Sequence, residues 1–213
     1  MVYALDRSLP IIIIFVITVA IQAGGASSRM GQDKALLPFL GKPLILRIVQ
    51  RISPIANEII ITTNFPANYT FLGLPLYPDV LPGRGALGGL YTAMVFAQFP
   101  LVAVVACDMP FVNPSLLAAL CDRLEETNAD VVLPQTDHGL EPLHAVYRRE
   151  TCLPVVKAAL DRGEWRLISW LSSVKFTKFS LDEVRLYDPD GMAFRNLNTL
   201  EEFQEAEETA KEE

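Results

Sequence analysis

The sequence contains few of the residues that build metal centres and disulfide frameworks. Its 213 residues include only three cysteines, Cys107, Cys121 and Cys152, and two histidines, His138 and His144. No two cysteines form a Cys-x-x-Cys pair, so the sequence indicates neither a disulfide scaffold nor a structural zinc site. We therefore expect free thiols in a reducing environment, which favours a cytoplasmic protein.

Positive charge is also scarce. Against 25 aspartates and glutamates there are 18 lysines and arginines, which gives a formal net charge of −7. A nucleic-acid backbone would repel such a chain, so nucleic acid is not an expected partner. An anionic ligand must instead be met by a local group of cations, for which the candidates are Arg29, Lys34, Lys42 and Arg84.

A hydrophobic run long enough to cross a membrane is missing as well. Residues 9–23 are almost all apolar, but polar residues interrupt them and the run is shorter than the roughly 18 to 20 residues that span a bilayer. We expect residues 17–21 to form a central strand that is buried on both faces. Residues 1–15 would be a disordered extension, and no membrane binding is expected. A membrane anchor at residues 11–23 is the alternative.

The two commonest phosphate-binding loops, the Walker pattern and the dinucleotide fingerprint, are absent from the sequence. A different glycine-rich segment, Gln-Ala-Gly-Gly-Ala-Ser-Ser-Arg-Met-Gly-Gln-Asp-Lys at residues 22–34, directly follows the expected strand. Gly24 and Gly25 have no Cβ, so a ligand can approach the backbone amides closely. Arg29 and Lys34 add a fork of donors and a point charge for phosphate oxygens. The segment therefore predicts a site for a nucleoside triphosphate.

The rest of the chain alternates apolar runs with segments of helical spacing, a pattern typical of an α/β fold with a mostly parallel sheet. We expect one domain over residues 16–204 and an acidic tail, residues 205–213, that frays. A second glycine-rich loop is expected at residues 83–89. The expected strands are residues 17–21, 59–63, 74–77, 101–106, 130–133, 143–147 and 174–179, and the expected helices lie within residues 43–52, 90–97, 114–124, 151–160 and 199–204.

Polar side chains follow several of the expected strands. Ligands of parallel sheets lie beyond the carboxyl ends of the strands, so Asn64, Asp79 and Asp108 are expected at the same edge as the glycine-rich segment. Asp108 would hold Mg²⁺ against a polyphosphate, or else cap the turn before Met-Pro. Asn64 and Asp79 would read the base, or simply form loops. His144, a lone histidine in an apolar strand, is expected to be a hydrogen-bonded core residue, with a role in substrate binding as the alternative.

The glycine-rich segment, as Ala-Gly-Gly-x-Ser-x-Arg-Met-Gly-x-Asp-Lys followed by Gly-Lys-Pro-Leu at residues 41–44, resembles the opening of the molybdenum cofactor guanylyltransferases. Cys-Asp-Met-Pro-Phe at 107–111, Pro-Leu-His-Ala-Val-Tyr at 142–147 and Asn-Leu-Asn-Thr at 196–199 resemble the same family. The resemblance spans residues 17–204. It implies a three-layer α/β/α, Rossmann-like nucleotidyltransferase fold of the glycosyltransferase-A type.

The resemblance also implies a reaction. GMP would pass from GTP to molybdopterin, or to its molybdenum form, with release of pyrophosphate. The incoming phosphate is already an anion, so catalysis would be positioning and charge stabilisation by Arg29, Lys34, Asp108 and Mg²⁺. Transient contact with molybdenum-insertion proteins and recipient molybdoenzymes is implied too, and we expect a monomer.

By the same resemblance, Asn196 and Asn198 are candidates for holding the pterin. Two positions depart from the family pattern: Gln22 stands where leucine is usual, and Ala86 where proline is frequent, which should loosen the second glycine-rich loop. The expected nucleotide-binding set, with Gly25 added from the composition of the first loop, is Gln22, Ala23, Gly24, Gly25, Lys34, Asn64, Asp79 and Asp108.

Other functions remain open. Within enzymes, the chain could transfer cytidylate to the same pterin, or a nucleotide to a sugar phosphate. The resemblance favours guanine, because the cytidylyl relatives are similar to Ala-Ala-Gly where this chain has Gly24 and Gly25, and a larger residue at the first glycine would crowd a purine. From another class, the chain could be a noncatalytic nucleotide-binding module, although binding alone would not require a magnesium carboxylate at Asp108.

Overall fold

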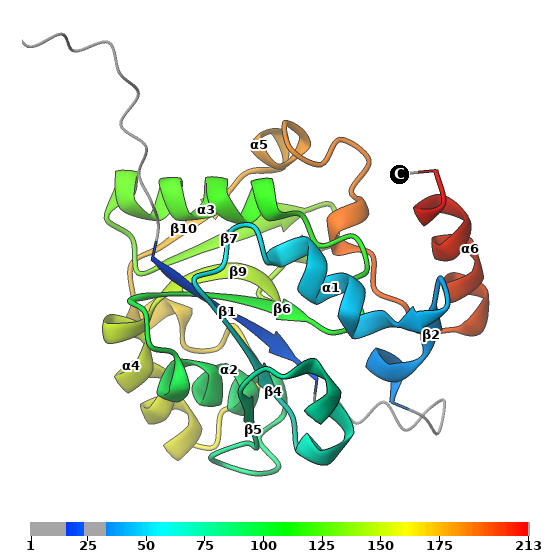
Figure 1. Ribbon diagram of the computed structural model, residues 1–213. Coiled ribbons are helices and arrows are strands. Elements are labelled where there is room, and N and C mark those ends of the chain that lie inside the picture. The colour runs from blue at the N-terminus through cyan, green and yellow to red at the C-terminus, as the bar shows by residue number, and fades with distance from the viewer. Residues whose placement is uncertain (1–15, 24–32, 213) are drawn as a thin grey trace, which may run out of the picture.

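The computed structural model describes residues 16–23 and 33–212 and shows a central sheet between two layers of helices (Figure 1). The order of the strands in the sheet is β10-β7-β9-β6-β1-β4-β5, with β8 paired to β7, while β2 and β3 form a separate pair. The strands are β1 (Ile17–Gln22), β2 (Pro38–Phe39), β3 (Lys42–Pro43), β4 (Glu58–Thr62), β5 (Leu76–Tyr77), β6 (Leu101–Ala106), β7 (Val131–Thr136), β8 (Gly139–Leu140), β9 (His144–Arg148) and β10 (Phe176–Phe179).

Helices cover both faces of the sheet, with α1 and α3 on one face and α2 and α4 on the other (Figure 1). This is the expected three-layer arrangement. The α-helices are α1 (Leu44–Ile52), α2 (Gly85–Phe96), α3 (Pro114–Thr127), α4 (Arg149–Asp161), α5 (Leu181–Arg185) and α6 (Leu200–Ala210), and the 3₁₀ helices are η1 (Lys34–Leu36), η2 (Pro66–Leu72), η3 (Leu171–Ser173) and η4 (Met192–Phe194).

The sheet is mostly parallel, and β9 is the reversed strand within its main path. Strand β1 is parallel to both β4 and β6, and its last residue, Gln22, lies opposite Thr62 and Ala106. Strand β9 is antiparallel to β6 and to β7. The carboxyl ends of β1, β4 and β6 therefore lie at one edge of the sheet, where ligands of such folds bind.

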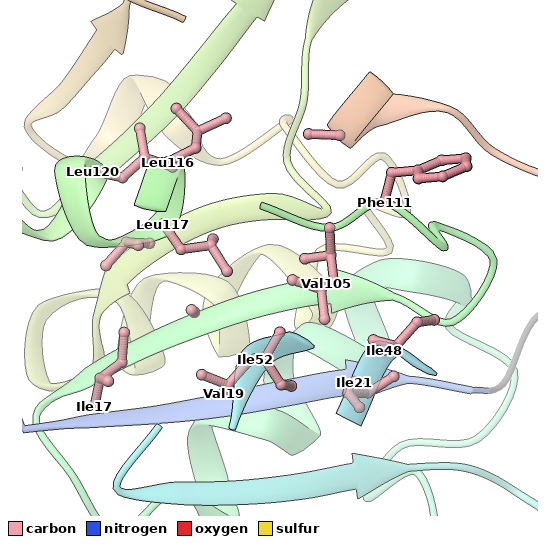
Figure 2. Packing of buried hydrophobic residues seen from close by; sticks show 14 of the residues in the cluster. Ile17, Val19, Ile21, Ile48, Ile52, Val105, Phe111, Leu116, Leu117 and Leu120 are labelled. Atoms are coloured by element: carbon pink, nitrogen blue, oxygen red, sulfur yellow. The ribbon is translucent and has the colours of Figure 1, made fainter. Parts of the chain in front are cut away.

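The continuous apolar run of β1 is explained by burial on both faces, as expected. Ile17, Val19 and Ile21 face the layer that contains α1 and α3, and Figure 2 shows Val19 and Ile21 beside Ile52 and Ile48 of α1. Ala20 faces the opposite core, formed with α2 and α4. All these side chains are at most 1% exposed.

Among the described residues, none of the helices is long and apolar enough to cross a bilayer. The extension expected at residues 1–15 lies outside the described residues.

Several helix boundaries differ from the expectation. Helix α2 begins at Gly85, so most of the expected loop at residues 83–89 is the first turn of a helix. The 3₁₀ helix η2 was not expected, because its sequence has no apolar periodicity. Helix α6 continues to Ala210, with Ala206 and Ala210 buried, so fraying from residue 205 is wrong. The side chains of Asn113 and Thr199 cap α3 and α6.

Candidate active site

The register of the sheet brings the predicted polar residues to one edge. Gln22 lies opposite Thr62 and Ala106, and Asn64 and Asp108 each follow two residues after these partners. The placement expected from the strand ends is therefore confirmed. Gly24, Gly25 and Arg29, also expected at this edge, lie outside the described residues.

Lys34, Asp108 and Asn198 meet at this edge, although they are distant in the sequence. The Lys34 ammonium donates a hydrogen bond to Asn198 Oδ1 at 2.8 Å and lies 3.7 Å from Asp108 Oδ2. The side chains of Lys34 and Asp108 are 12% and 22% exposed. A cation and a carboxylate thus stand side by side with limited access to water.

Burial sets the electrostatics of Asp108. It raises the pKa of this carboxyl above its ordinary value, while the nearby Lys34 ammonium acts in the opposite direction. The peptide N–H of Leu197 donates to the backbone oxygen of Asp108 at 3.0 Å, which anchors the residue from a second segment of the chain. A carboxylate in this setting gains from any further cation that comes close.

The backbone of Lys34 is held by a contact that sequence reasoning missed. Asp33 caps η1 and accepts a hydrogen bond from the Ala35 N–H at 3.2 Å. The hydroxyl of Tyr69, from η2, donates to Asp33 Oδ2 at 2.5 Å. Tyr69 is fully buried, and burial raises the pKa of its hydroxyl. The position of Asp33 before Lys-Ala-Leu signals a helix cap in the sequence, but nothing there identifies Tyr69 as its partner.

Asn64 and Asp79 form a reciprocal pair at the ends of β4 and β5. Asn64 Nδ2 donates to Asp79 Oδ2 at 2.9 Å, and the Asp79 N–H donates to Asn64 Oδ1 at 3.1 Å. Both side chains are therefore fixed before any ligand arrives. The pair offers a carboxylate in a defined orientation, which is the acceptor that the N–H groups of a guanine base need.

The tip of β1 is tightly built. The backbone oxygen of Gln22 accepts from the Cys107 N–H at 3.1 Å, and the Ala23 N–H donates to the Thr62 oxygen at 2.8 Å, so the sheet uses both groups. A Cβ at Gly89 would lie 2.8 Å from Gln22 Oε1. Gly89 thus leaves room for the Gln22 side chain where α2 lies against β1.

Two further candidates have different surroundings. Asn196 is exposed, and its side chain makes no hydrogen bond within the part of the chain that the structure describes. His144 is fully buried, with its ring centroid 5.1 Å from that of Phe194, as expected of a core residue. The expected hydrogen bond is not found, because neither ring nitrogen has a partner among the described residues. Burial lowers the pKa of His144 to about 4, opposed by backbone groups of Asn113 and Ala193.

Comparison with known proteins gives consistent results over most of the chain. The family model described as MobA-like NTP transferase domain matches residues 19–175. The molybdenum cofactor guanylyltransferase of Desulfosudis oleivorans is 31% identical over 92% of this chain and 96% of its own length. A probable molybdenum cofactor guanylyltransferase of Pelotomaculum thermopropionicum is 35% identical over 85% and 87% of the two chains.

Solved structures agree with the sequence matches. Molybdopterin-guanine dinucleotide biosynthesis protein A of Archaeoglobus fulgidus superposes with a TM-score of 0.79 and 25% identity, over 92% of this chain and all of that one. A 4-diphosphocytidyl-2C-methyl-D-erythritol synthase of Anaerococcus prevotii superposes with a TM-score of 0.67 over 93% and 97% of the two chains. Its identity of 11% shows a shared fold alone.

Proposed function

Because this chain belongs to the family of MobA-like NTP transferase domains, we propose that it is a molybdenum cofactor guanylyltransferase, as its relatives are named. In this reaction a terminal phosphate oxygen of molybdopterin, or of its molybdenum form, attacks the α-phosphorus of GTP. The bond from that phosphorus to the oxygen bridging to the β-phosphate breaks, and pyrophosphate leaves with the electron pair. The other product is molybdopterin guanine dinucleotide.

The observation that supports this function is the pairing of Lys34 with Asp108 at the carboxyl edge of β1 and β6. The chain as a whole carries a net charge of −7, so a triphosphate needs a local cation to be held there. The Lys34 ammonium donates to phosphate oxygens, and its limited exposure strengthens that attraction. At the other end of the edge, the Asn64 and Asp79 pair is suited to accept from N1–H and N2–H₂ of guanine.

The residues fit a magnesium ion as well. Among the described residues, no group of three or more histidine, cysteine, aspartate or glutamate side chains could enclose a metal. Asp108 would hold Mg²⁺ with one carboxylate, and the nucleotide would supply further oxygens, which is the usual mode for this cation. When bound, the ion supplies charge neutralisation for the leaving pyrophosphate.

The reaction tests the proposal directly. Purified protein is incubated with molybdopterin, MgCl₂ and GTP, and the dinucleotide and pyrophosphate are quantified; CTP and ATP are run in parallel. We expect product with GTP and little with the other two. If the product forms with CTP instead, the protein is a cytidylyltransferase. If it binds nucleotide without turnover, it is a noncatalytic nucleotide-binding module.

The variant Asp108→Asn is the matched test of the site. It keeps the size of the side chain and removes its charge, so we expect turnover to fall about 10²-fold or more while the melting temperature does not fall. The melting temperature should hold because burial already disfavours the charged form of Asp108. Wild-type turnover in this variant would refute the role of Asp108.

A further inference from the structure

Asn198 contacts Lys34, a residue of the proposed nucleotide site, although it comes from near the C-terminal end of the sequence. Its Oδ1 accepts a hydrogen bond from the Lys34 ammonium at 2.8 Å, across 164 positions of sequence. The same ammonium is 3.7 Å from Asp108 Oδ2, farther than a hydrogen bond. Of these neighbours, Asn198 is therefore the one that directly holds the cation.

The segment that carries Asn198 is braced on both sides. Leu197 is fully buried and its N–H donates to the Asp108 backbone oxygen. The backbone N–H of Asn198 donates to the Glu202 carboxylate, and Thr199 caps α6 with the same glutamate completing the capping box. The side chain of Asn198 thus projects from a fixed turn, and holding the lysine requires little further ordering.

The chemistry of an asparagine suits this position. A lysine ammonium has three N–H donors. A neutral carbonyl oxygen can accept a hydrogen bond from one of them and leave the positive charge of the lysine uncompensated. The same ammonium is already within ion-pair distance of Asp108, so the asparagine adds a second, neutral anchor for the cation. We propose that Asn198 is a positioning residue of the nucleotide site, which fixes the Lys34 ammonium where it can meet the phosphates.

This proposal rests on the function proposed above and differs from the expectation that Asn198 holds the pterin. A positioning role through Lys34 operates before any pterin is present. A pterin contact would affect only the second substrate. Asn196, two residues earlier and without a hydrogen bond in the described part of the chain, provides the matched control from the same segment.

The decisive experiment is calorimetric titration of GTP with MgCl₂ in the absence of pterin. The proteins compared are the wild type, Asn198→Ala, Lys34→Ala, the double variant and Asn196→Ala. We expect Asn198→Ala to weaken GTP binding about tenfold, as the loss of a hydrogen bond to a charged group does. Asn196→Ala should bind GTP like the wild type. In the Lys34→Ala background, adding Asn198→Ala should change affinity less than about twofold, because the two act as a unit.

Steady-state kinetics give the second measurement. At saturating GTP, Asn198→Ala should show a reduced kcat and an unchanged KM for molybdopterin. The proposal would be overturned if Asn198→Ala bound GTP as tightly as the wild type. It would also be overturned if Asn198→Ala weakened GTP binding equally in the wild-type and the Lys34→Ala backgrounds, or if it raised only the KM for molybdopterin. If the wild type itself binds no GTP with magnesium, the function proposed above fails and this inference with it; if the wild type binds, only the inference is at stake.

Discussion

The hydrogen bond from Tyr69 to Asp33 connects η2 with the residue that precedes Lys34, and its removal by Tyr69→Phe can be predicted in detail. The variant deletes one oxygen and keeps the ring, so packing around the fully buried side chain is preserved. The Asp33 carboxylate keeps its bond from the Ala35 N–H but loses its bond from the hydroxyl at 2.5 Å.

The expected loss follows from the kind of bond that is removed. A hydrogen bond to an ionised acceptor contributes about 1.5–3 kcal/mol, and water cannot readily replace the hydroxyl beside a buried ring. We therefore expect Tyr69→Phe to lower the free energy of unfolding by about 2 kcal/mol. GTP affinity should fall a few-fold, because Asp33 then fixes the backbone of Lys34 less firmly.

Urea unfolding measures the first effect and GTP titration the second. The single variants Tyr69→Phe and Asp33→Ala and their combination form a double-mutant cycle, in which the coupling should exceed about 1 kcal/mol. Burial raises the pKa of Tyr69 in the folded protein above its ordinary pKa near 10. The protonated hydroxyl therefore contributes its full stability below about pH 10, and this contribution is lost as the pH rises through the pKa of the folded state. Additive losses, or a Tyr69→Phe protein as stable as the wild type, would refute the reasoning.

Two other predictions concern the base and the core. Asp79→Asn keeps the shape of the pair with Asn64 but removes the charged acceptor, so GTP binding should weaken about tenfold and the preference for GTP over ITP, which lacks the 2-amino group, should shrink in parallel titrations. His144 is buried in its neutral form with a pKa of about 4, below the ordinary 6.5, so the unfolded chain binds the proton first as the pH falls. Relative to His144→Leu, the wild type should lose up to about 3 kcal/mol of stability between pH 6.5 and pH 4, measured by urea unfolding at several pH values; parallel curves for the two proteins would contradict this.

The edge of the sheet could be predicted from sequence because its signals are local. A strand buried on both faces is a continuous apolar run, and the residue after it must lie at the carboxyl edge, which is why Asn64 and Asp108 were placed correctly. A local pattern was also present after residue 204, but the acidic composition of this segment led to the prediction of a frayed tail. Phe203, Ala206 and Ala210 are buried at helical spacing, which indicates a packed helix rather than a tail.

The contacts that tune the site could not be predicted in this way. The partners of Lys34 and Asp33 are Asn198 and Tyr69, which depend on where η2 and the segment before α6 pack. Neither segment has a pattern that fixes its position along the sheet. Tertiary packing alone brings them together, so no local signal in the sequence identifies these pairs.

The reversed direction of β9 has a consequence for how the protein can vary. Because β9 runs against β6 and β7, the chain turns back at the ligand edge after Thr136 instead of crossing to the far side through a helix. The short turn that includes β8 therefore lies at this edge and is attached at both ends to the sheet. An insertion in this turn would not displace any helix, so the turn can change in length while the sheet beneath it keeps its register.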